Sequence, residues 1–83
     1  MLMIRLRRGG AKKKPIYRVV VSDSRKTPQA DYLEQVGFYD PNQEPPEIRI
    51  DLEKVDTWRN QGAGVSDTVQ SLILKAKKQQ QQQ

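Results

Sequence analysis

The sequence contains neither cysteine nor histidine. Without cysteine the chain has no disulfides and no thiolate metal sites, and without histidine it lacks the commonest general base and zinc ligand. No stretch approaches the ~20 apolar residues that a membrane span needs. Arginines at positions 5, 7 and 8 interrupt the region where a signal peptide has its apolar core. We therefore expect a soluble protein that is not exported, and we expect neither catalysis nor a cofactor, metal or small-molecule substrate.

The chain has 83 residues, which is enough for one domain. A chain of this length buries only about 60% of the surface that its unfolded form exposes, so the core must be small. The last five residues are all glutamine and offer nothing apolar to bury. We predict a single domain over residues 1–78 and a disordered polyglutamine tail over residues 79–83.

The net charge of +5 is distributed unevenly along the chain. Residues 1–26 contain nine basic residues and one acidic residue, a net charge of +8, whereas residues 27–56 contain eight acidic and two basic residues. A concentration of positive charge at one end of a chain attracts polyanions, although a solvated basic surface that only aids solubility has the same composition. Charge therefore favours a nucleic-acid partner without requiring one.

Two segments near the N-terminus have the pattern of β-strands. Residues 3–8 alternate between apolar and basic side chains, which is the period of a half-buried strand. Residues 16–22 are rich in β-branched side chains, and their three consecutive valines indicate a central strand that is buried on both faces. Gly9-Gly10 and the basic run that leads to Pro15 predict a loop between the two strands. We expect a hairpin with a long basic tip.

The rest of the chain predicts two further strands and two helices. Residues 32–39 and 47–51 have the composition of strands, and Gly37 indicates a bulge or a close backbone approach. The apolar period then becomes helical, with Asp51 as the N-cap of the first helix and Ser66 as that of the second. The fold class is therefore α+β, with a four-stranded sheet and two C-terminal helices packed against it. The apolar stripes of the helices are Leu52, Val55 and Trp58 in the first, and Val69, Leu72, Ile73 and Ala76 in the second.

The basic side chains of the predicted hairpin are candidate phosphate ligands. Arg5 and Arg7 are expected on one face of their strand, about 7 Å apart at ~3.3 Å per residue. Tyr17, Phe38 and Tyr39 are candidates for stacking on bases or ribose. Of these, Phe38 is expected in the core more than at a binding surface, and Trp58 is expected in the core. RNA is favoured over DNA because neither predicted helix is basic along its length, as a major-groove recognition helix is. The predicted RNA-binding residues are Arg5, Arg7, Arg8, Lys12, Lys13, Lys14, Tyr17, Arg18, Arg25, Lys26 and Tyr39.

Two other interpretations remain open from the residues alone. Asp23, Asp31, Asp40 and Asp51 could hold a cation such as Mg²⁺ in a metal-dependent nuclease, although aspartate is also favoured in turns and at helix N-caps. The basic segment could instead bind anionic lipid at a membrane surface. No amphipathic basic helix accompanies that segment, which disfavours the membrane interpretation.

Several segments, taken in order, resemble the bacterial-type small-subunit (30S) ribosomal protein sixteen family. Each segment is weak by itself, but their order and spacing over residues 3–76 are specific. The segments are IRLRRG at 4–9, KKPIYRVVV at 13–21, DSR at 23–25, LEQVGFYDP at 33–41, Trp58, Gly62-Ala63 and SDTV at 66–69.

The resemblance implies a mainly antiparallel sheet and a structural role in the small ribosomal subunit, on a cytoplasmic bacterial ribosome or an organellar one. It implies that the chain binds rRNA and stabilises its folding during assembly, beside neighbouring small-subunit proteins. Residues 26–31 read KTPQAD and lack a further arginine and a glycine that the family usually has. That segment therefore has less positive charge than the corresponding segment of the family. The family's basic positions map onto Arg5, Arg7, Arg8, Lys13, Lys14, Arg18 and Arg25.

Overall fold

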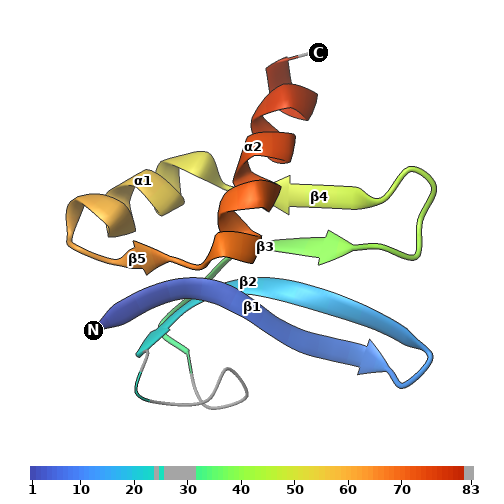
Figure 1. Ribbon diagram of the computed structural model, residues 1–83, viewed down its shortest axis with the longest axis horizontal. Helices are drawn as coiled ribbons and strands as arrows, with labels where there is room; N and C mark the ends of the chain where they lie inside the picture. The colour runs from blue at the N-terminus through green and yellow to red at the C-terminus, as the bar shows by residue number, and fades with distance from the viewer. Residues whose placement is uncertain (24, 26–31, 82–83) are drawn as a thin grey trace.

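The structure is a computed structural model that describes residues 1–23, 25 and 32–81. Its elements are β1 (Leu2–Ala11), β2 (Lys14–Asp23), β3 (Glu34–Asp40), β4 (Glu47–Ile50), α1 (Leu52–Asn60), β5 (Gly64–Val65) and α2 (Asp67–Gln81). The strands form one sheet in the order β4-β3-β2-β1-β5 (Figure 1). All neighbours are antiparallel except β1 and β5. The expected α+β fold is confirmed, with five strands instead of the predicted four.

The β1–β2 hairpin is the longest feature of the sheet. Its register pairs Leu2 with Asp23 at one end and Ala11 with Lys14 at the other, so only two lysines form the turn. The predicted long loop after residue 8 was therefore wrong. Gly10 has a φ of 79° and stays paired within β1. Glycine adopts this conformation readily, so it supplies a local irregularity near the turn without ending the strand.

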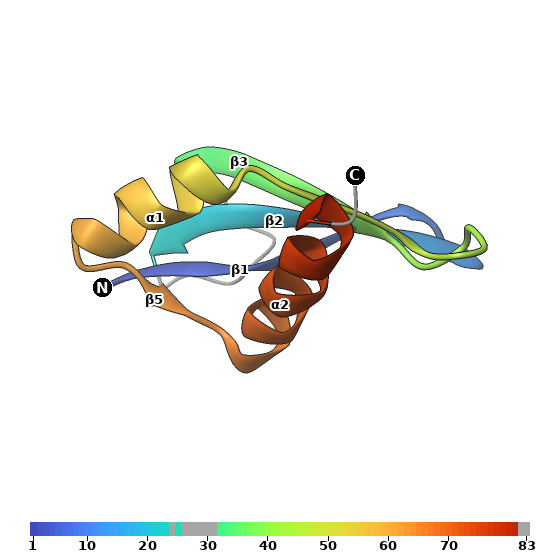
Figure 2. The same cartoon turned by 90° about the horizontal axis from the view of Figure 1, so that it is seen from above.

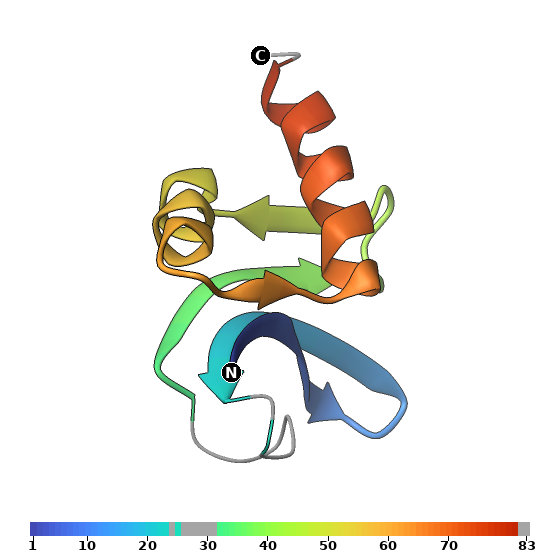
Figure 3. The ribbon, with the colours of Figure 1, turned by 60° about the vertical axis from the view of Figure 1, so that its left-hand side comes forward.

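The helices cover one face of the curled sheet (Figures 1 and 3). The core between them holds Ile4 of β1, the valines at 19, 21 and 36, and the predicted apolar stripe of α2, all buried. Trp58 packs against this core, as expected, and its Nε1 donates a hydrogen bond to Glu34 Oε1 over 3.1 Å. The three consecutive valines of β2 are fully buried, which confirms that β2 is a central strand.

Local hydrogen bonds fix both helix starts as predicted. Asp51 Oδ1 accepts from the backbone N–H of Lys54 over 3.2 Å, and Ser66 Oγ accepts from that of Val69 over 3.3 Å. α2 continues to Gln81. The predicted disorder of residues 79–83 stays a prediction for the chain in solution, and residues 82–83 lie outside the described part. None of the helices formed by the described residues has the length and apolarity to cross a bilayer.

Gly37 lies where two strands approach closely, as the sequence indicated. A Cβ at this position would collide with the carbonyl oxygen of Arg49 and lie 2.9 Å from Ile50 Cα. The register of β2 against β3 also shifts beside it, from Val19–Gly37 to Val20–Gln35, so that β3 contains one extra residue. This bulge changes which side chains of β3 face the helices.

The far end of the sheet extends beyond the helices. The β1–β2 turn and the β3–β4 connection project past α2 (Figure 2). The amide Nδ2 of Asn42 in the connection donates to the carbonyl oxygen of Pro15 over 3.0 Å, which joins the two projections. Neither helix therefore covers the sheet at this end (Figure 2).

Candidate nucleic-acid interface

The register of the strands decides which side chains share a face, because directly opposed residues in an antiparallel pair point to the same side. Ile4 and Leu6 of β1 face the helices. Arg5 and Arg7 alternate with them and belong to the opposite side, which we call the helix-free face. Arg18 lies opposite Arg7 in the register of β1 and β2 and joins this face.

A row of four side chains crosses the helix-free face. Arg7 lies opposite Arg18, Arg18 opposite Phe38 of β3, and Phe38 opposite Arg49 of β4. The guanidinium carbon of Arg7 lies 5.2 Å from the centroid of the Tyr32 ring, a cation–π contact. Arg49 was not among the predicted residues, and the prediction that Phe38 lies in the core was wrong. The alternation of residues 47–50 could have revealed Arg49, because both flanking isoleucines are buried.

Positive charge in this row is poorly compensated within the protein. Arg7 and Arg18 form no ion pair with any acidic group in the described part of the chain. Arg49 Nε lies 3.0 Å from Glu47 Oε1, but this pair is solvent-exposed and such pairs contribute little to stability. Arginines directly opposed on neighbouring strands repel each other. The row therefore has a net positive potential that the fold itself does not require.

At the open end of the hairpin, two arginines are held by their own neighbours. Arg5 donates from Nε to Ser22 Oγ and from Nη2 to the carbonyl oxygen of Asp23, both over 2.8 Å. Arg25 Nη2 lies 2.8 Å from Asp23 Oδ2. The hydrogen bond from the Arg25 side chain holds the pKa of Asp23 well below its usual range, and the same bond raises the pKa of Arg25. The charge of Arg25 is thus partly neutralised, although its side chain is 81% exposed.

The hairpin turn (Lys12 and Lys13) and the adjoining Lys14 form an exposed basic part of the molecule. Lys12, Lys13 and Lys14 are all exposed. Arg8 Nη2 donates to the carbonyl oxygen of Lys12 over 3.4 Å, a weak contact that leaves the lysine ammonium groups unaffected. The predicted contact by Lys26 lies outside the described residues. The turn and Lys14 can therefore present three point charges to a phosphate backbone.

Three predicted residues lie on the other side of the sheet. Arg8 is opposite Tyr17, and Tyr17 is opposite Tyr39, in the register that places Leu6 and Ile48 toward the helices. The two tyrosine rings are stacked, with centroids 6.1 Å apart and an interplanar angle of 23°. The structure therefore does not bring Arg8, Tyr17 and Tyr39 together with the cations of the helix-free face.

Known proteins resemble this chain over most of its length. A family model described as Ribosomal protein S16 matches residues 8–66, more than half of the chain. The chain belongs to the ribosomal protein S16 family. It is similar to the small ribosomal subunit protein bS16 of Desulforamulus reducens, with 51% identity over 88% of this chain and 82% of the relative. The corresponding protein of Helicobacter acinonychis is 50% identical over 92% of this chain and all of the relative.

Membership in the S16 family confirms the resemblance seen in the sequence. The chain is a ribosomal protein, a structural constituent of the ribosome in the cytoplasm, and it is not an enzyme. The metal-dependent nuclease interpretation is thereby overturned.

The aspartates have local structural roles in this S16 protein. Asp40 accepts from the backbone N–H of Asn42 over 3.0 Å and from Gln43 Nε2 over 3.0 Å, and the bond from Asn42 lowers the pKa of Asp40. Asp51 caps α1. The described residues contain no group of three acidic side chains that could hold a metal ion, and Asp31 lies outside them. Turn and cap formation explains these aspartates.

Proposed function

We propose that this S16 protein is a constituent of the small ribosomal subunit that binds rRNA and stabilises its folding during assembly. The helix-free face and the hairpin turn bind the RNA, and neighbouring small-subunit proteins are the other partners of the chain. The relatives with about 50% identity are named small ribosomal subunit proteins, which supports the choice of subunit. The observation that carries the proposal is the in-register row of arginines on the helix-free face.

The row is explained by a polyanionic partner better than by folding. Two like charges directly opposed on neighbouring strands lower the stability of a sheet by roughly 0.2–1 kcal/mol relative to a neutral pair. At exposed sites the loss is at the lower end of this range. Arg7 and Arg18 are opposed in this way, and neither forms an ion pair with an acidic group among the described residues. A phosphate backbone laid along the strands removes the repulsion and releases condensed counterions. Relief of this repulsion therefore makes the free energy of binding more favourable.

The length of the hairpin suits a large folded RNA. β1 has ten residues, so at ~3.3 Å per residue it spans roughly 33 Å. The cations lie along this whole length, from Arg5 through Arg7 and Arg18 to the lysines of the turn. Such contacts to phosphates fix position and orientation without reading sequence. We therefore expect recognition of RNA shape, as is common for double-stranded RNA.

A substitution of Arg18 tests the proposal because it affects folding and binding in opposite directions. Arg18→Gln removes the repulsion with Arg7, so the free energy of unfolding should stay equal or rise by a few tenths of a kcal/mol. Binding of purified protein to small-subunit rRNA should weaken about 5-fold at 0.1 M salt, because one phosphate contact is lost. Filter binding measures the affinity, and urea unfolding followed by Trp58 fluorescence measures the stability.

Arg59→Gln is the matched control, since it removes the same charge from α1. Arg59 lies in the last turn of that helix, where a positive charge interacts favourably with the helix dipole. The control should therefore lose a little stability and keep its rRNA affinity. Wild-type affinity in Arg18→Gln, or equal weakening in both variants, would contradict the proposed face. Co-sedimentation of the wild-type chain with small subunits on a sucrose gradient tests the choice of partner.

A further inference from the structure

The side of the sheet that carries the helices has a second concentration of basic and aromatic groups. Beyond α2, the stacked rings of Tyr17 and Tyr39 form a flat surface, with Arg8 opposite Tyr17 on β1. Figure 2 shows that no helix covers this end of the sheet. The cations of the helix-free face point away from this surface, so the proposed rRNA contact described above makes no use of it.

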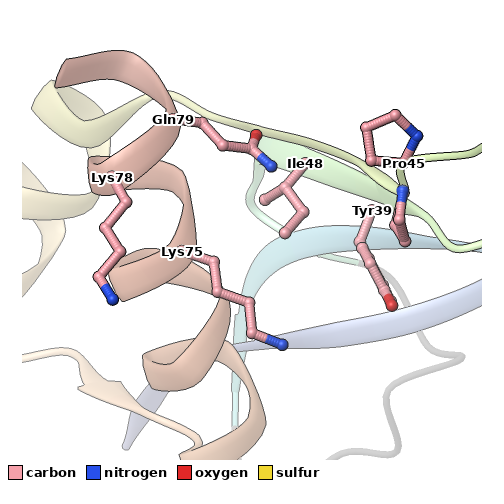
Figure 4. A pocket seen from close by; sticks show the side chains of 7 residues that line it. Tyr39, Pro45, Ile48, Lys75, Lys78 and Gln79 are labelled. Atoms are coloured by element: carbon pink, nitrogen blue, oxygen red, sulfur yellow. The ribbon is translucent and has the colours of Figure 1, made fainter. Parts of the chain in front are cut away.

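A pocket lies between this surface and α2. Its volume is about 320 Å³, and Tyr39, Pro45 and Ile48 form its apolar side. Lys75 extends from α2 toward Tyr39, and Lys78 lies on the same helix one turn further on (Figure 4). The pocket is thus assembled from residues 39–48 and residues 75–79, two parts of the chain that are far apart in sequence.

The charges around the pocket select an anionic ligand. Lys75 and Lys78 are exposed and form no ion pair with the described residues. No acidic side chain is among the described residues that line the pocket. The flat tyrosine and the proline ring offer apolar surfaces against which a planar group can stack. A ligand that fits both features has a flat aromatic part and a phosphate.

The size of the pocket excludes a double helix, whose bases are stacked and paired in its interior. A volume near 300 Å³ is at the lower end of the range for small-molecule sites. Unpaired RNA bases are commonly recognised by stacking on tyrosine while lysines neutralise the adjoining phosphate. We propose that the pocket binds one unpaired nucleotide of the rRNA, with the base against Tyr39 and Pro45 and the phosphate between Lys75 and Lys78. This inference rests on the proposed function and adds a second, single-stranded contact to it.

The experiment uses the full chain, labelled for NMR, and the single-stranded hexanucleotide r(A)6 as the probe. Binding should shift the ring signals of Tyr39 and the side-chain signals of Ile48 and Lys75 in a saturable way. Lys75→Gln combined with Lys78→Gln should weaken this binding at least 10-fold at 0.1 M salt, because two phosphate contacts are lost. Lys54→Gln combined with Lys77→Gln gives the same net charge of +3 and should weaken binding less than 3-fold.

Substitutions of Tyr39 test the stacking part of the inference. Tyr39→Leu should weaken r(A)6 binding about 5- to 150-fold, the range found for loss of one stacked base. Tyr39→Phe keeps the aromatic ring and should bind as the wild type does. Since Tyr39 packs against the core, Tyr39→Phe and the lysine variants keep the test informative if Tyr39→Leu does not fold.

The outcomes separate this inference from the proposed function. If r(A)6 leaves the pocket signals unchanged or shifts only residues of the helix-free face, the pocket is not a nucleotide site and the inference is overturned. It is also overturned if both lysine double variants bind alike. The proposed function survives either result as long as folded small-subunit rRNA binds and Arg18→Gln weakens it. Loss of folded-rRNA binding altogether would instead overturn the proposed function.

Discussion

Two triple variants with the same net charge test whether RNA binding depends on where the positive charge lies or only on its total amount. The first replaces Lys12, Lys13 and Arg18 with glutamine, which removes two cations from the hairpin turn and one from the helix-free face. None of these side chains has a described acidic partner, and all are exposed. The fold should therefore be unaffected. The net charge falls from +5 to +2.

The second variant replaces Lys54, Arg59 and Lys77 with glutamine and has the same net charge of +2. These side chains are exposed on α1 and α2, outside the helix-free face, the hairpin turn and the pocket. Any difference between the two variants must come from where the charge lies, because its amount is identical. Circular dichroism of both variants verifies that they are folded.

Counterion release gives the expected magnitude. Each phosphate contact contributes about −0.7 to −0.9 to the slope of log K against log salt. About six contacts along the hairpin give the wild type a slope of roughly −4 to −5, and the first variant should retain roughly −2 to −3. At 0.1 M salt three lost contacts correspond to roughly a 100- to 500-fold loss of affinity. The second variant should keep a slope near that of the wild type.

Filter binding of small-subunit rRNA at roughly four or five salt concentrations between about 0.05 and 0.4 M measures the affinity and the slope of log K against log salt, which is linear over about this range. Equal slopes for the two triple variants would show that net charge alone governs binding and would refute the assignment of the helix-free face. A slope that stays at the wild-type value in the first variant would refute the hairpin turn as a phosphate-binding element.

Three further predictions concern the fold that holds these surfaces. Gly37→Ala should destabilise the protein by about 1–3 kcal/mol because its Cβ collides with the backbone of β4, whereas Gly9→Ala, whose nearest neighbour would lie at 3.6 Å, should have little effect in urea unfolding. Ile73→Ala should cost about 2–5 kcal/mol because the side chain is buried in the core, and the adjacent Leu74→Ala, at a site 54% exposed, should cost far less. The pKa of Asp40 is lowered in the folded protein, so ionised Asp40 stabilises the fold. This contribution is fully present above the ordinary carboxyl pKa of about 3.9, and it is lost as the pH falls through the folded-state pKa. Unfolding measured at pH 7 and pH 2 should therefore show a stability difference between the wild type and Asp40→Asn that shrinks in acid; a difference independent of pH would contradict this explanation.

Local patterns determined most of the elements. The alternation of residues 3–8, the valines of β2 and the helical period after residue 51 each follow from the geometry of one segment and its need to bury one side. Helix caps are local as well, since Asp51 and Ser66 bond to backbone only three residues away. These features could be predicted because each depends on neighbours close in sequence. β5 was missed because its two residues are too few to show a period.

Phe38 shows why alternation failed in β3. A strict period of two places Phe38 on the same side as Val36, which is buried in the core. The extra residue in β3 interrupts that period, so Gly37 and Tyr39 face the helices and Phe38 does not. A bulge is set by how the strand pairs with its neighbours, and a single strand's sequence does not reveal which residue is the extra one.

The family and the basic character of the first 26 residues were determined by the sequence alone. The division of the candidate residues between two faces was decided by tertiary structure, because the choice of which face the helices cover depends on contacts between distant segments. Register across four strands placed Arg49 beside Phe38 and in one row with Arg18 and Arg7, and the packing of α2 placed Lys75 beside Tyr39. Side chains so far apart in sequence meet only when the whole core is assembled.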